Sequence, residues 1–258
     1  DPFFLKVGNL DTLTLGHGLL MRNYANDIEF PAIRRIGFNV GIDFGRVGFE
    51  VLTNDLAAPE IFGTRLYARP IGGSPLAVGV SGVADIAPAS ELPETDSEGA
   101  TVFTTERDAD PIFVNVALDL DLPVFERDAF TLVLFGDVGG LLPYLRNATP
   151  GLEQGFQEQA LTHETASGTE LRNYGIASGV FGNVSLLDFR LEFQNYHGIF
   201  EPAFYDANYD RSRGEKVVQT IEYLQDPGAP KYENETLGIY GEAGFTIAEL
   251  VRFDAGYL

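Results

Sequence analysis

The chain has 258 residues, a length that fits one large domain or two small ones. Its formal net charge of −21 at pH 7 makes nucleic acid a poor partner, because another polyanion is repelled by such a field. The absence of cysteine excludes a disulfide framework, cysteine-based zinc sites and thiol catalysis.

Most of the chain alternates between apolar and polar residues, the period-two pattern of a β-strand with two different faces. A strand-like stretch opens the chain at residues 3–8, and helical periodicity is nearly absent. We expect about ten to twelve strands in all. After the opening stretch, the pattern predicts strands in chain order over 34–45, 47–51, 61–71, 75–86, 111–124, 130–145 (a pair or one bent strand), 173–184, 186–194, 235–250 and 251–258.

The stretch "LLDFRLEFQ" at 186–194 raises the question of which side of the sheet is the inside. Its dry face carries Leu187, Phe189, Leu191 and Phe193, and its wet face carries Asp188, Arg190, Glu192 and Gln194. In a soluble sheet the dry face packs on a core, whereas in a membrane barrel it meets lipid and the charges line a lumen. The strand alone is compatible with both.

The connections between the predicted strands alternate in length. Short connections fall near 45–48, 71–75, 124–129, 182–186 and 248–251, and long polar ones near 24–33, 53–60, 87–111, 145–171 and 200–233. Tight turns at one rim and long loops at the other are typical of outer-membrane barrels, whose tilted strands need about 9–11 residues to cross. The sequence therefore predicts an all-β, antiparallel up-and-down transmembrane β-barrel in the bacterial outer membrane, with residues 1–258 as a single domain.

The segments "LTLGHGLLMRNYAND" (13–27) and "YGIASGVFGNVSLLDFRLEFQNYHGIFEPAFYDANYDR" (174–211), with the glycine-spaced strands, resemble Gram-negative outer-membrane β-barrel proteins. More narrowly, they are similar to barrel proteins of spirochaete-type envelopes. The resemblance implies an outer-membrane location and no particular substrate. Such barrels usually end on an aromatic residue, whereas this chain ends on Leu258, so we expect a C-terminal continuation and a piece of a larger barrel. At Asp1, either a signal sequence has been removed or the chain begins within a longer protein.

Other features suggest little chemistry. His17 falls on a predicted strand, a short helix is expected within 151–167, and aromatic residues at 200–209 suggest a girdle at the membrane interface. The residues Asp206, Asn208 and Asp210 begin like a calcium loop, but the later positions do not fit the EF-hand. No nucleophile constellation can be named, so we expect neither an enzyme nor a cofactor or metal.

The charges at lumen positions are the best functional candidates. Basic residues come early and acidic ones later in this set: Lys6, Arg35, Arg65, Arg69, Asp119, Asp121, Asp188, Arg190, Glu192, Arg252 and Asp254. Facing walls of opposite charge would select solutes in a diffusion pore, whereas local ion pairs would only hold a filled barrel together. We expect a porin or passive channel for small polar solutes. A closed structural or adhesive surface barrel and a soluble secreted domain that binds carbohydrate or calcium remain alternatives.

Overall fold

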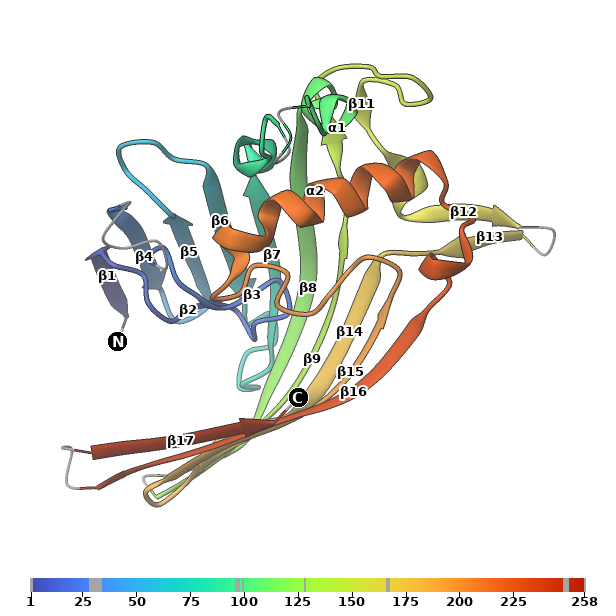
Figure 1. Ribbon diagram of the computed structural model, residues 1–258. Helices are drawn as coiled ribbons and strands as arrows, with labels where there is room; N and C mark the ends of the chain where they lie inside the picture. The colour runs from blue at the N-terminus through green and yellow to red at the C-terminus, as the bar shows by residue number, and fades with distance from the viewer. Residues whose placement is uncertain are drawn as a thin grey trace.

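The protein is built around one large antiparallel sheet, which curves around the elements on its concave side (Figure 1). The computed structural model describes residues 2–27, 34–95, 98, 100–127, 129–165, 168–247 and 251–257, without the side chains of 164, 165, 246, 247, 251–255 and 257. Within these ranges the sheet runs through β1 (Phe3–Gly8), β4 (Gly37–Asp43), β5 (Val47–Thr53), β6 (Ile61–Ala68), β7 (Ala77–Asp85), β8 (Pro111–Arg127), β9 (Phe130–Leu141), β14 (Tyr174–Val184), β15 (Leu187–His197), β16 (Glu235–Ile247) and β17 (Val251–Tyr257).

Strand order in this sheet follows chain order, and every neighbouring pair is antiparallel. The predicted all-β, antiparallel class is therefore confirmed. Several strands exceed ten residues, and β8 has 17. Closure into a barrel is not part of the described structure: along the sheet, β1 pairs with β4 alone and β17 with β16 alone.

Smaller elements lie beside the sheet or extend it. They comprise β2 (Leu13–Leu15) and β3 (Met21–Tyr24), which form a hairpin, β10 (Tyr144–Leu145), β11 (Gly155–Phe156), β12 (Thr162–Thr165), β13 (Gly168–Leu171), α1 (Thr104–Ala109), α2 (Tyr209–Gln225) and 3₁₀ helices at Pro88–Glu91, Glu158–Ala160 and Pro230–Tyr232. Among the described residues, no helix is long and apolar enough to cross a membrane.

Two expected local structures are wrong. In place of the α-helix expected within 151–167, the described part of this segment, 151–165, holds β11, the 3₁₀ helix Glu158–Ala160 and β12. His17 lies in the turn between β2 and β3 instead of on a strand. The long helix α2 lies in the stretch expected to be a polar loop. Its buried positions have helical spacing, which is the pattern that identifies it: Tyr209, Arg213, Val217, Ile221 and Leu224.

The outward face of the sheet is apolar. Directly paired residues form a row across five adjacent strands, β6 to β9 and β14, and all of them are exposed: Leu66, Val80, Leu118, Val138 and Ile176. A second row crosses β8, β9, β14 and β15 through Leu122, Leu134, Val180 and Leu191. Because directly opposite residues share a face, these rows form continuous apolar bands.

The inward face, on the concave side, is small and polar. The row through β7, β8, β9, β14 and β15 is buried throughout and consists of Gly79, Asp119, Asp137, Ala177 and Gln194. Gly79 is needed there, since a Cβ at this position would overlap the carboxylate of Asp119. The sheet is thus inverted relative to one in a water-soluble protein, with its charges buried and its apolar side chains exposed.

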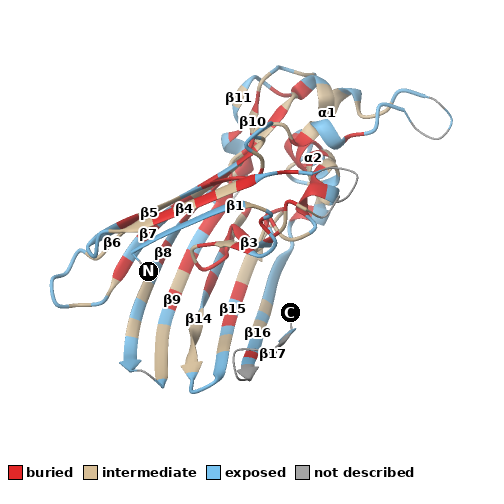
Figure 2. Cartoon of the chain, turned by 90° about the vertical axis from the view of Figure 1, so that its left-hand side faces the viewer, coloured by how far each residue is buried: buried red, intermediate tan, exposed pale blue. Residues whose placement is uncertain are grey.

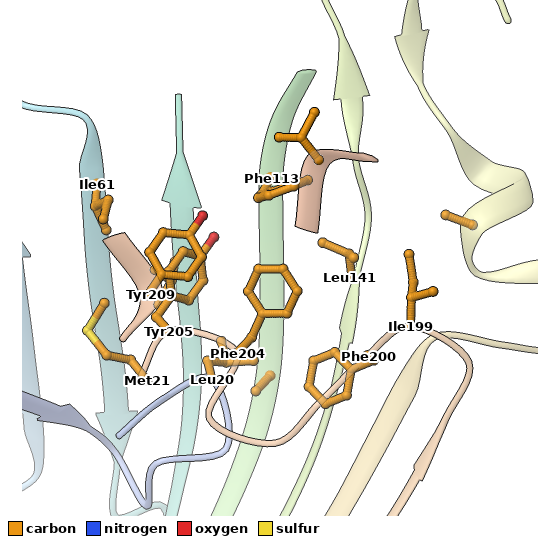
Figure 3. Packing of buried hydrophobic residues seen from close by; sticks show 14 of the residues in the cluster. Leu20, Met21, Ile61, Phe113, Leu141, Ile199, Phe200, Phe204, Tyr205 and Tyr209 are labelled. Atoms are coloured by element: carbon orange, nitrogen blue, oxygen red, sulfur yellow. The ribbon is translucent and has the colours of Figure 1, made fainter. Parts of the chain in front are cut away.

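The hydrophobic core lies between the sheet, the β2–β3 hairpin and α2, on the concave side (Figure 3). Buried residues gather near α2 and in the upper parts of the strands (Figure 2). The aromatic residues expected to form an interfacial girdle are central to this core, so that expectation is wrong: Phe200, Phe204, Tyr205 and Tyr209 are all at most 2% exposed. Tyr205 and Tyr209 pack with ring centroids 4.5 Å apart.

Two distant segments pair their backbones inside the curve of the sheet. Met21 and Tyr205 form a parallel bridge. The Arg22 amide donates to the Tyr205 carbonyl at 3.1 Å, and the Tyr205 amide donates to the Leu20 carbonyl at 3.0 Å. This pairing fixes the β2–β3 hairpin to the chain that leads into α2.

Candidate functional site on the concave face

The polar side chains of the concave face gather in clusters that join the sheet to the β2–β3 hairpin. The first cluster surrounds His17, whose turn brings its imidazole against β8 and β9. Nδ1 of His17 lies 2.8 Å from Oδ1 of Asp137, and Nε2 lies 3.6 Å from Oδ2 of Asp121. Arg65 joins from β6, with Nη2 2.5 Å from Oδ1 of Asp119 and 3.6 Å from Oδ2 of Asp121. Both signs of charge meet in this cluster.

His17 is a cation at neutral pH. Burial opposes its charge, but hydrogen bonds to Asp121 and Asp137 outweigh burial and raise the pKa of His17 from 6.5 to about 9. The imidazolium therefore holds the β2–β3 turn against two strands of the sheet.

Metal binding is the other chemistry to consider for this cluster. Ligand atoms of His17, Asp119 and Asp121 lie within 4.8 Å of one another, which is compatible with a cation site. However, the Arg65 guanidinium already contacts both carboxylates, so a metal ion would have to displace it. The arrangement fits an ion-pair network better than a metal centre.

The second cluster centres on Glu192, which is fully buried on β15. Its Oε2 accepts from Arg22 at 2.8 Å and from Arg190 Nε at 2.7 Å, and its Oε1 accepts from Gln194 at 2.7 Å. The Arg190 Nη2 also donates to the His17 carbonyl at 2.6 Å. The guanidinium of Arg22 lies over the ring of Tyr240 on β16, 4.6 Å from its centroid. This cluster joins the hairpin to β15 and β16.

The third cluster fixes α2 to the sheet. Arg213, fully buried, contacts Oε2 of Glu60 at 2.7 Å and Oδ2 of Asp85 at 3.4 Å. Tyr209 donates to the same Asp85 oxygen at 2.8 Å. Nearer the start of the helix, Asp210 accepts from Arg35 Nη1 at 3.0 Å and from the hydroxyl of Tyr24. Asp210, the third residue of the calcium-like motif, is thus engaged with an arginine.

The remaining predicted lumen residues lie apart from these clusters. Lys6 pairs with Asp11 at 2.5 Å, and Arg69 pairs with Asp43 at 3.1 Å. Asp188 is exposed on β15, and Arg252 and Asp254 belong to β17, where their side chains lie outside the described residues. Each predicted basic residue named in the clusters or pairs above thus has an acidic neighbour, and the charges are arranged locally within the described part of the chain.

Many residues of the clusters are absent from the predicted set, among them Asp137, Arg22 and Tyr240. Asp137 interrupts the apolar stretch 130–145, and a lone carboxylate within an apolar strand is itself a signal of a polar interior. Arg22 and Tyr240 carry no such signal, because their contact joins segments far apart in the chain.

Two hollows open on the concave side near β14 to β16. The first, of about 580 Å³, lies between α2 and β15, and its lining includes Gln194, Tyr196 and Lys216. The second, of about 940 Å³, lies toward the other end of the strands, and its lining includes Phe181, Asn183 and Asp188. Both are large enough for a small organic solute.

Comparison with known proteins adds no relative. No protein-family model, no curated protein and no solved structure matches this chain.

Proposed function

We propose that this protein is a bacterial outer-membrane β-protein whose polar concave face borders a passive path for small polar solutes. The observation that carries the proposal is the inverted sheet. On β8, Leu118 is 57% exposed, whereas Asp119, the next residue, is 3% exposed and faces inward. Lipid against the outward face and water against the inward face would give each side chain a suitable environment.

Water is a poor environment for the outward face. Each Å² of apolar surface left in water costs about 25 cal/mol, and water-soluble monomers rarely expose continuous apolar patches beyond a few hundred Å². The paired rows from Leu66 to Ile176 and from Leu122 to Leu191 run across most of the sheet. A hydrocarbon phase removes that cost without any rearrangement of the strands.

The two hollows support passage of solutes rather than a solid interior. They lie on the same polar side of the sheet, and amide, hydroxyl and charged groups line them. Water and polar solutes can exchange hydrogen bonds with such a surface, as they do in diffusion pores.

The second candidate is a structural surface protein with a closed interior. It is favoured by the clusters at His17 and Glu192, which fix the β2–β3 hairpin across the concave face. This hairpin and α2 would then fill the lumen completely, as side chains and inserted segments do in small barrels.

The test begins with fractionation of cells that express the chain with its native flanks. We expect the protein in outer membranes, with a gel mobility that shifts on boiling, and stepwise conductance after reconstitution in planar bilayers. A membrane-bound, heat-modifiable protein without conductance would support the closed alternative. Recovery as a monomer in buffer without detergent would contradict both membrane proposals.

A further inference from the structure

The two hollows of the concave face meet at one side chain. Tyr240 of β16 lines both of them, and no other described residue does. Successive residues of a strand face opposite sides of the sheet. Ile239 and Gly241, the neighbours of Tyr240 on the strand, line neither hollow, whereas the Tyr240 ring contacts Arg22 on the inward side. Tyr240 is therefore part of the wall that separates the two hollows.

Charged groups around the ring are balanced at this point. Arg22 lies against the face of Tyr240 and lines the first hollow, whereas Arg190 lines the second. Both arginines bind the buried carboxylate of Glu192, and the Tyr240 hydroxyl donates to Glu242 at 2.5 Å. Two cations and two carboxylates thus surround the junction, so it carries little net field in either direction.

The walls of the hollows combine charged residues, neutral hydrogen-bonding groups and aromatic rings. The charged residues of the first hollow are Arg22, Lys216, Glu201, Asp206 and Glu215, and those of the second are Arg190, Asp188 and Glu242. Gln194, Asn208 and Gln219 line the first hollow beside Tyr196. The second has Thr131 and Asn183 beside Phe181. Amide and hydroxyl groups exchange hydrogen bonds with solute hydroxyls, and aromatic faces pack against the apolar faces of sugar rings.

We infer that Tyr240, held by Arg22, forms the constriction of a path along β14–β16 that admits small uncharged, hydroxyl-rich solutes of monosaccharide size. This inference rests on the proposed function and specifies its route and solute class. Removal of the ring would widen the junction and leave the charged residues around it in place. The path would then accept larger sugars with little change in its preference between anions and cations.

The experiment measures the swelling of proteoliposomes in isosmotic glucose, sucrose and raffinose. Tyr240→Ala enlarges the junction and Tyr240→Trp narrows it. The matched control is Tyr67→Ala, because Tyr67 of β6 also lies under an arginine, with Arg65 at 4.9 Å, but lines neither hollow. Heat-modifiable mobility in gels verifies that every variant is folded before its swelling is compared.

We expect wild type to pass glucose faster than raffinose, Tyr240→Ala to raise raffinose entry severalfold, Tyr240→Trp to slow glucose, and Tyr67→Ala to match wild type. The reversal potential in a potassium chloride gradient should be the same for Tyr240→Ala as for wild type, because the substitution leaves the charged lining in place. Equal effects of Tyr240→Ala and Tyr67→Ala, no effect of either Tyr240 variant, or a large change of ion selectivity in Tyr240→Ala would overturn the inference while wild-type conductance still supported the proposed function. Folded wild type that passes neither ions nor sugars would overturn both.

Discussion

The concave face over β6–β9 differs from that over β14–β16, although the same strand pattern builds both. Over β6–β9 the charged side chains form ion pairs with one another: Arg65 pairs with Asp119 and Asp121, and His17 pairs with Asp137. Over β14–β16 the same face borders two hollows. The β2–β3 turn and the N-terminal half of α2 lie against the first region, as the contacts of His17 with Asp121 and Asp137 and of Arg213 with Asp85 show. Within the described part of the chain, Arg22 of the hairpin reaches the second region only at Glu192 and Tyr240.

Period-two alternation therefore determines which face is polar, but it does not determine whether that face is filled. Filling depends on which inserted segment reaches the face and which charges it brings. Glu192 stands at the boundary, since it binds Arg22 of the hairpin and also Arg190 of the sheet. Four substitutions test this division, and they follow here from the largest expected effect to the smallest.

Arg213→Ala should destabilise the filled region most. The substitution leaves the carboxylate of Asp85 buried without its cation, which costs about 3–5 kcal/mol. Urea unfolding in detergent micelles, followed by circular dichroism, measures the loss. Lys231→Ala removes an exposed pair with Glu222 near the other end of the helix and should change little. A similar loss of unfolding free energy in the two variants would contradict the stabilisation of α2 by the buried pair of Arg213 and Asp85.

Leu191→Arg tests the outward face near the second region. A charge that faces lipid at the midplane costs about 2–4 kcal/mol, so the yield of assembled protein in outer membranes should fall. Leu191→Phe keeps the position apolar and should assemble as wild type does. Normal assembly of the arginine variant would show that Leu191, 55% exposed in the structure, does not face lipid.

Glu192→Gln tests the boundary between the regions. On sequence grounds alone this lumen residue would tolerate neutralisation, but two arginines share its carboxylate. Loss of the charge should cost roughly 2–3 kcal/mol, because both guanidinium groups lose a charged acceptor in a buried place. Glu126→Gln, on an exposed end of β8, should stay within about 0.5 kcal/mol of wild type in the same urea titration. Equal stability of the two variants would refute the bridging role.

The smallest effect is a pH dependence at His17. Because its pKa is raised from 6.5 to about 9 on folding, the protonated imidazole stabilises the fold fully below pH 6.5, and this contribution is lost as the pH rises through about 9. We expect the free energy of unfolding of wild type to decline across that window. His17→Gln should remove most of this slope, and an unchanged slope would assign the pH dependence to other groups.

Local patterns account for the part of the structure that the sequence predicts. Alternation over 111–122 is enough to identify β8 and its two faces, because every second residue of a strand faces the same side of the sheet and its polarity matches that side. The same reasoning identifies Asp119, Asp121 and Glu192 as inward residues.

Contacts between distant segments account for the rest. The aromatic residues Phe200, Phe204 and Tyr205 suggest an exposed belt only while α2 is unrecognised, because nothing nearby in the chain indicates what covers them. His17 has the parity of a strand residue, yet glycines on both sides allow a turn, and Gly16 and Gly18 both have positive φ. Its partner Asp137 is 120 positions away.

The backbone bridge between Met21 and Tyr205 has a consequence for the order of folding. The hairpins of the sheet pair strands that follow one another in the chain. The bridge between Met21 and Tyr205 instead closes a loop of 184 positions, from 21 to 205. Loop closure of that length is entropically unfavourable until intervening strands have shortened the distance, so the bridge is expected to form late. The β2–β3 hairpin, although synthesised early, gains this backbone pairing only after the last third of the chain has been reached. A nascent or truncated polypeptide that lacks residues 203–205 would thus leave the strand edge at Met21 without its backbone partner.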